Sequence, residues 1–168
     1  MSAPGVRITE RRREYPVTGS TSAQIRDVIA LLGPRRDGRA YVASTEWEVR
    51  WSYRRAQETA GFVAQTVTVE VDVVMVLPRW RPPPNAAAAL IADWDREMAA
   101  VMAHEEGHRD LAITAGHAVA QAIESIAPQP SAAALDEAVS TRAREVLAEA
   151  RAREVAYDDE TAHGLERG

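Results

Sequence analysis

The sequence predicts an α+β fold, in which an N-terminal antiparallel β-sheet with one helix is followed by a long helix and a second, C-terminal helix. In the first half, Glu46–Tyr53 and Thr66–Leu77 alternate apolar and polar residues, as strands with one packed and one wet face do. In the second half, apolar residues recur at helical spacing in an alanine-rich background. We therefore expect one domain over residues 1–168, with a β-rich half at 6–80 and a helical half at 85–168.

The elements of the first half have clear beginnings and ends. Residues 6–17 are expected to form the first strand. A helix should follow, because Thr21 or Ser22 can cap its first turn and Gly33-Pro34 stops it. This helix would carry Ile25, Val28, Ile29 and Leu32 at helical spacing. The proline run at 82–84 ends the β-rich half.

The second half reads as two helical segments. The first extends from about Ala86 to Ile126 and would measure roughly 60 Å as a straight helix, which is long for a domain of this size. A bend or break is therefore expected near Gly107 or Gly116. Ser131 can cap the second helix. Helical periodicity fades at residues 157–164, so a polar tail outside the helix is expected there.

Composition argues against several classes of protein. The net charge of −5 and the pI near 5.4 argue against nucleic acid as the main partner. No apolar stretch has the length of a transmembrane helix, and no signal peptide is recognised at the start. With no Cys, disulfides, thiolate metal sites and cysteine nucleophiles are all excluded. Compartment and oligomeric state stay open.

The strongest functional motif is His104-Glu105-Glu106-Gly107-His108, an HExxH sequence in the first long helix. Four residues make little more than one helical turn, so both imidazoles share a face and can bind one zinc ion. Glu105 can then act as general base on a metal-activated water. The motif predicts a zinc metallopeptidase that acts on a peptide or protein substrate. The alternatives are a catalytically inactive metal-binding or protein-interaction domain that retains this helix, and a surface helix with two hydrogen-bonded histidines.

A catalytic zinc site normally takes three protein ligands, and the motif supplies two. Thr114 stands where the extended metzincin pattern has a histidine, which disfavours that class. A downstream glutamate of the gluzincin kind could be Glu137 or Glu145, and His163 in the polar tail could fold back over the motif. Three residues of the motif helix itself would lie on other faces of it: Asp110, His117 and Glu124.

Several segments together resemble one protein family. They are Tyr15–Gly19, Thr45-Glu46-Trp47, Leu77–Trp80, the HEEGH motif and residues 157–164. These segments are similar to the DUF922 family, bacterial proteins of unknown function that are described as predicted zinc-dependent proteases. The resemblance covers most of the chain and implies a minimal zincin-like domain with Zn²⁺ as its cofactor. It also implies a periplasmic or secreted protein, although without a signal peptide or Cys a cytoplasmic location stays open.

The last of these segments bears on the site residues. Its sequence resembles the family's ending, of the form YDxxTxHG, and this resemblance favours His163 as the third metal ligand. Tyr157 could donate a hydrogen bond to the oxyanion of the intermediate, or could be a core tyrosine that anchors the tail. Asp158 could orient a ligand histidine through a hydrogen bond, or could itself be a ligand. The predicted site therefore has His104, His108 and His163 on the metal, with Glu105 and Tyr157 as catalytic residues.

Overall fold

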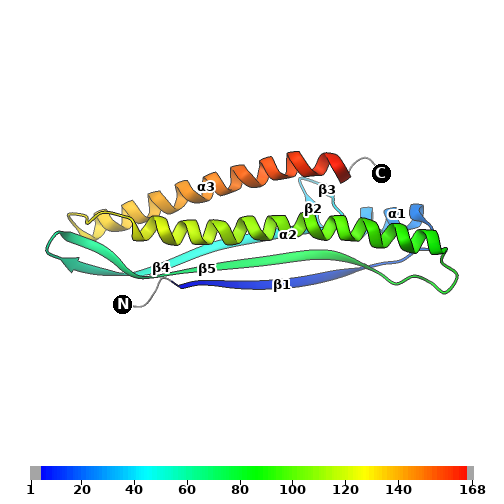
Figure 1. Cartoon of the computed structure of the whole chain (residues 1–168), viewed down its shortest axis with the longest axis horizontal. Coiled ribbons are helices and arrows are strands. Elements are labelled where there is room, and N and C mark those ends of the chain that lie inside the picture. Colours follow the sequence, from blue (N-terminus) through cyan, green and yellow to red (C-terminus); the bar gives the residue numbers. More distant parts are fainter. Residues whose placement is uncertain (1–4, 166–168) are drawn as a thin grey trace. The chain divides into compact units, whose positions relative to one another are not determined.

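The computed structural model describes residues 5–165, with side chains for residues 5–161. Along the chain the elements are β1 (Gly5–Val17), α1 (Ser22–Leu32), β2 (Arg35–Arg36), β3 (Arg39–Ala40), β4 (Ser44–Glu58), β5 (Gly61–Trp80), α2 (Ala88–Glu124) and α3 (Ala132–Leu165) (Figure 1). The predicted α+β class is confirmed, with a sheet first and two long helices after it. The short strands β2 and β3 were not anticipated.

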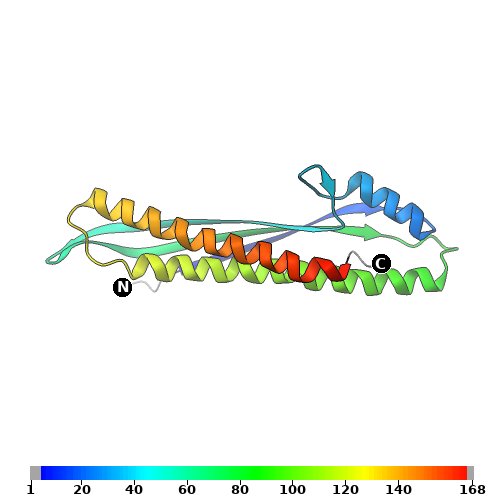
Figure 2. The same cartoon turned by 90° about the horizontal axis from the view of Figure 1, so that it is seen from above.

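The three long strands form one sheet in the order β1-β5-β4, and β2 pairs with β3 in a separate antiparallel ribbon. A tight turn at Thr59-Ala60 joins β4 to β5. The arrowheads of β1 and β5 point to the same end in Figure 2, so these neighbours run in the same direction and the sheet is mixed. The expected sheet was antiparallel throughout. The β1–β5 pair differs because the chain reverses direction twice between them, once before β4 and once after it.

Contacts divide the chain into two compact units. Of the described residues, unit 1 contains 5–9, 47–73 and 109–160, and unit 2 contains 10–46, 74–108 and 161–165. Each unit therefore takes strand and helix residues from both halves of the sequence.

Unit 1 has a core in which α2 and α3 pack on the same side of the strands (Figure 1). The alternating valines of β5 are buried here, and Val69, Val71 and Val73 have no exposed surface. The residues that face them from the helices include Ala112, Val119, Ile123, Leu135, Val139 and Ala143. The alternation of β5 therefore marks an apolar face that the helices cover, as predicted.

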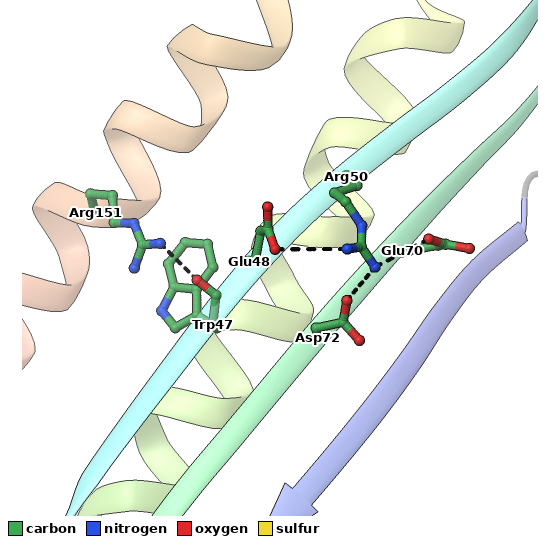
Figure 3. A network of polar contacts seen from close by, with 6 residues as sticks. All are labelled: Trp47, Glu48, Arg50, Glu70, Asp72 and Arg151. Atoms are coloured by element: carbon green, nitrogen blue, oxygen red, sulfur yellow. Dashed lines mark hydrogen bonds and ion pairs between the residues drawn. The ribbon is translucent and has the colours of Figure 1, made fainter. Parts of the chain in front are cut away.

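A tryptophan of β4 ties α3 to the sheet in the same unit. The guanidinium of Arg151 lies 3.5 Å from the centroid of the Trp47 ring and donates a hydrogen bond of 2.9 Å to the Trp47 carbonyl (Figure 3). The indole Nε1 of Trp47 in turn donates to Glu154, at 2.9 Å. Trp47 is 6% exposed, so it both fills core volume and anchors the helix.

The opposite face of the same strands is charged. Arg50 of β4 forms ion pairs with Asp72 at 2.5 Å and Glu70 at 3.4 Å, both on β5, and with Glu48 at 3.8 Å (Figure 3). These groups alternate with the buried residues of the two strands, which confirms one packed and one wet face.

Unit 2 contains α1, the β2–β3 ribbon and the N-terminal part of α2. Thr21 caps α1, since its hydroxyl accepts a hydrogen bond from the Gln24 amide at 3.3 Å. Ile25 of α1 packs with Tyr15 and Trp80 in one apolar cluster. A second cluster contains Ala43, Met75, Leu77 and Val101.

Helix α2 continues without interruption for 37 residues, so the expected break near Gly107 or Gly116 is wrong. The helix gives its first part to unit 2 and its last part to unit 1, and no single unit has to accommodate its whole length. Gly116 serves close packing instead. A Cβ at this position would lie 2.2 Å from Cγ2 of Val71, so only a residue without a side chain fits against β5.

Helix α3 reaches Leu165, so the expected polar tail at 157–164 is helical as well. The helical recurrence of apolar residues fades there because one face of the helix carries polar groups, those of Asp158 and Thr161, which are one turn apart. Glu160 and Ala162 of this segment have a high helix propensity. Among the described residues, no helix combines the length and the apolar character that crossing a membrane requires.

Candidate metal centre

Helix α2 brings the two histidines of the motif together. The Nε2 atoms of His104 and His108 lie 3.2 Å apart, and their rings meet edge to face at an interplanar angle of 81°. Two zinc–nitrogen bonds of about 2.05 Å at a tetrahedral angle would separate the nitrogens by about 3.3 Å. The pair therefore has the spacing that two ligands of one zinc ion need, and His108 is 3% exposed.

A threonine of α3 positions the first of these rings. The hydroxyl oxygen of Thr161 lies 2.8 Å from Nδ1 of His104, within unit 2. An imidazole that donates its Nδ1 proton to an oxygen has an unprotonated Nε2, which is the form that binds a metal. Thr161 thus fits the role of an outer group that fixes both the orientation and the tautomer of His104.

Glu105 lies in the protein interior with a partner from β4. Its carboxylate accepts a hydrogen bond of 2.5 Å from the hydroxyl of Thr45. Glu105 is 5% exposed and Thr45 is 3% exposed. A carboxylate so far from solvent requires a donor, and Thr45 supplies it while fixing the side chain next to the histidine pair.

The neighbouring glutamate is placed differently. The side chain of Glu106 is 41% exposed and lies 4.0 Å from Arg12 of β1. Successive residues of a helix are about 100° apart around its axis, so two adjacent glutamates reach different surroundings. Of the two, Glu105 is the one that a site at the histidines can use.

A carboxylate of α3 is a third candidate ligand. Among the described residues, His104, His108 and Asp158 each offer a ligand atom, and these atoms all lie within 4.8 Å of one another. This cluster could hold a metal ion. Two imidazoles and one carboxylate are a ligand set that zinc accepts in catalytic sites. Asp158 had been expected as an outer group or an alternative ligand, and the cluster includes it as a possible ligand.

The roles expected for His163 and Tyr157 remain predictions. His163 lies on α3, but its side chain is outside the described part of the chain. Tyr157 is half-buried and directly precedes Asp158, and its role towards an oxyanion stays a prediction. Glu137 and Glu145 are exposed on α3, where Glu145 pairs with Arg142 at 3.1 Å. They behave as solvent-facing helix charges.

Reasoning from the sequence missed Thr45 and Thr161 as supporting residues. Both stand in segments that resemble the family, Thr45-Glu46-Trp47 and the closing residues 157–164, but neither had been given a role. The resemblance of these segments was the available signal. The resemblance did not reveal the contact partners: Glu105 is 60 residues from Thr45 in the sequence, and His104 is 57 residues from Thr161.

Comparison with models of protein families decides the relationship. The model for DUF922, described as a bacterial protein of unknown function, matches residues 12–164. The chain belongs to the DUF922 family. The matched region of this DUF922 protein includes the histidine pair, Asp158 and both threonines. No curated protein and no solved structure matches the chain significantly.

Proposed function

We propose that this DUF922 protein is a zinc-dependent metallopeptidase in which His104 and His108 bind the metal and Glu105 is the general base. One observation carries the proposal. The two Nε2 atoms lie 3.2 Å apart, and the residue after His104 is a buried glutamate whose carboxylate is hydrogen-bonded. A pair of histidines that served only to stabilise a helix would not need a buried glutamate beside it, because burying a carboxylate costs free energy.

Each residue of the site has a distinct role in the proposed reaction. Zinc, when bound, polarises a peptide carbonyl and lowers the pKa of water. Glu105 takes the proton of the attacking water and passes it to the nitrogen of the leaving amine. Thr45 holds the Glu105 carboxylate in place for this transfer, and Thr161 holds His104. Asp158 or His163 completes the ligand set, and Tyr157 would donate a hydrogen bond to the oxyanion.

The first experiment is a measurement of metal content and peptidase activity on protein purified without a metal-affinity tag. We expect about one zinc per chain in the wild type and a marked loss in His104→Ala. Activity is measured against a broad peptide library, with and without a chelator. Chelation should abolish hydrolysis, and adding zinc should restore it.

Two glutamine variants separate catalysis from metal binding. Glu105→Gln should keep the metal and lower kcat by at least about 100-fold, because it removes the base. Glu106→Gln is the matched control, since it makes the same change at the exposed neighbour and should leave kcat unaltered. Zinc binding without chelator-sensitive hydrolysis would instead identify an inactive metal-binding domain. A fully active Glu105→Gln variant would refute the mechanism.

A further inference from the structure

Unit 2 carries an exposed apolar and basic surface apart from the histidine pair. Leu31 is 72% exposed, Leu32 47% and Tyr41 43%. Among the described residues, these three make up most of the large apolar side chains that are exposed, and they fall within eleven positions of the sequence. Together with Arg35 and Arg39 we call them the α1–β3 patch.

Backbone contacts hold the members of the α1–β3 patch together. A Cβ at Gly33 would lie 2.3 Å from the Tyr41 carbonyl oxygen, so the chain after β3 returns directly against the end of α1. The Tyr41 amide donates to the Pro34 carbonyl at 2.8 Å. These contacts keep the backbone of Tyr41 beside Gly33 and Pro34, which directly follow the two exposed leucines.

The arginines of the patch add positive charge to an acidic protein. Arg35 donates to the carbonyls of Gly38 and Ala30, at 3.2 and 3.3 Å, which orders its side chain without neutralising it. In the part of the chain that the structure describes, neither Arg35 nor Arg39 takes part in an ion pair. Residues 21–43 contain four arginines and two aspartates, whereas the whole chain has a net charge of −5.

We propose that the α1–β3 patch docks this protein onto the surface of a bilayer that contains anionic phospholipids. Leucine side chains gain free energy by entering the boundary between headgroups and acyl chains, and tyrosine rings favour the same depth. Arginines bind the lipid phosphates and respond to the negative surface potential. A second copy of the patch would bring like charges together, which favours a lipid surface over self-association.

The wild-type protein can test the proposal directly. Co-sedimentation is measured with phosphatidylcholine vesicles that contain or lack phosphatidylglycerol. Binding should require phosphatidylglycerol and should weaken as the salt concentration rises, because salt screens the attraction between arginine and phosphate. Absence of binding to either vesicle, or equal binding to both, would overturn the proposal whatever the variants do.

Paired variants then locate the contact. Arg35→Gln with Arg39→Gln should lower the vesicle partition coefficient by about 25-fold, at about fivefold for each arginine near an anionic surface. Leu31→Ser with Leu32→Ser should lower it at unchanged charge. Arg11→Gln with Arg13→Gln, on the exposed part of β1, makes the same change of charge elsewhere and should have little effect.

Two outcomes would assign the contact differently. An equal loss in the β1 control would show diffuse attraction by net charge and overturn the assignment to the patch. If the leucine variant abolished a dimer seen by sedimentation and left vesicle binding intact, the patch would be an interface between copies. All the substituted side chains are exposed, so the variants should retain the circular dichroism spectrum of the wild type.

Discussion

At the scale of single residues, the hydrogen bond between Thr161 and His104 makes a testable claim about metal affinity. Thr161→Val should weaken zinc binding by about 10- to 100-fold, because the ring loses the partner that fixes its orientation and tautomer. Thr161→Ser keeps the hydroxyl and should restore most of the affinity. A competition titration with a zinc-binding dye measures both. A valine variant with wild-type affinity would remove Thr161 from the site.

The third metal ligand is a second question at this scale. Because Asp158 is a candidate ligand together with the histidine pair, Asp158→Ala should cause a marked loss of zinc, measured by mass spectrometry after dialysis. Asp159→Ala is the matched control, since this neighbour is exposed on the same helix. His163→Ala tests the ligand that the sequence favoured. If the Asp158 variant keeps its zinc and the His163 variant loses it, the histidine is the ligand.

The sequence could predict one part of this site and not another, for a physical reason. The spacing of His104 and His108 depends on helical geometry alone, so a motif of five residues defines it. The contacts of Thr45 and Thr161 depend on how β4 and α3 approach α2, and no local pattern encodes that approach. Asp158 was among the candidates only because the ending of the chain resembled a family motif.

At the scale of elements, the fit of α2 against β5 depends on Gly116. Gly116→Ala should destabilise the protein by about 1–2 kcal/mol, because overpacking against Val71 outweighs the higher helix propensity of alanine. Urea unfolding measures the difference. Val71→Ala should lessen the effect of Gly116→Ala in the double variant by making room for the new methyl group. A more stable Gly116→Ala variant would show that the contact is loose.

Patterns of hydrophobicity located the elements well because burial produces them. Apolar and polar residues alternate along the strands where a single face meets the helices. Thr21 and Ser131 cap helices, because their hydroxyls accept hydrogen bonds from backbone amides. The continuity of α2 could not be predicted in this way, since a glycine can mark either a break or a close contact. The direction of β1 relative to β5 depends on how many times the chain reverses between them.

At the scale of the whole molecule, the hydrogen bonds of Asp136 make stability depend on pH. Asp136 near the start of α3 accepts hydrogen bonds from Arg55 at 2.6 and 2.7 Å and from Tyr53 at 2.5 Å. The arginine, and then the tyrosine, hold the pKa of Asp136 below its ordinary value of 3.8. A lowered pKa in the folded state stabilises the protein above the unfolded pKa, and this contribution disappears as the pH falls through the folded value.

Asp136→Asn should therefore lower the Tm at neutral pH, and its difference from the wild type should shrink as the pH falls below the ordinary aspartate pKa of 3.8 and the wild-type carboxyl becomes protonated. Glu137→Gln, which removes a charge from the adjacent exposed position, should lower the Tm by less. Thermal unfolding followed by circular dichroism across this pH range measures both variants. A constant difference between Asp136→Asn and wild type would show that its ionisation does not contribute.

Metal binding should also change the stability of the whole molecule. A ligand that binds only the folded state at 100 times its Kd contributes about 2.7 kcal/mol, and a chain of this length gains about 2–4 °C in Tm for each kcal/mol. Zinc should therefore raise the Tm of the metal-free wild type by several degrees. Glu105→Gln should keep this rise, because the glutamate is no ligand, whereas His104→Ala and His108→Ala should lose it. An equal rise in the histidine variants would place zinc elsewhere on the protein, and a loss in Glu105→Gln would make the glutamate a ligand rather than a base.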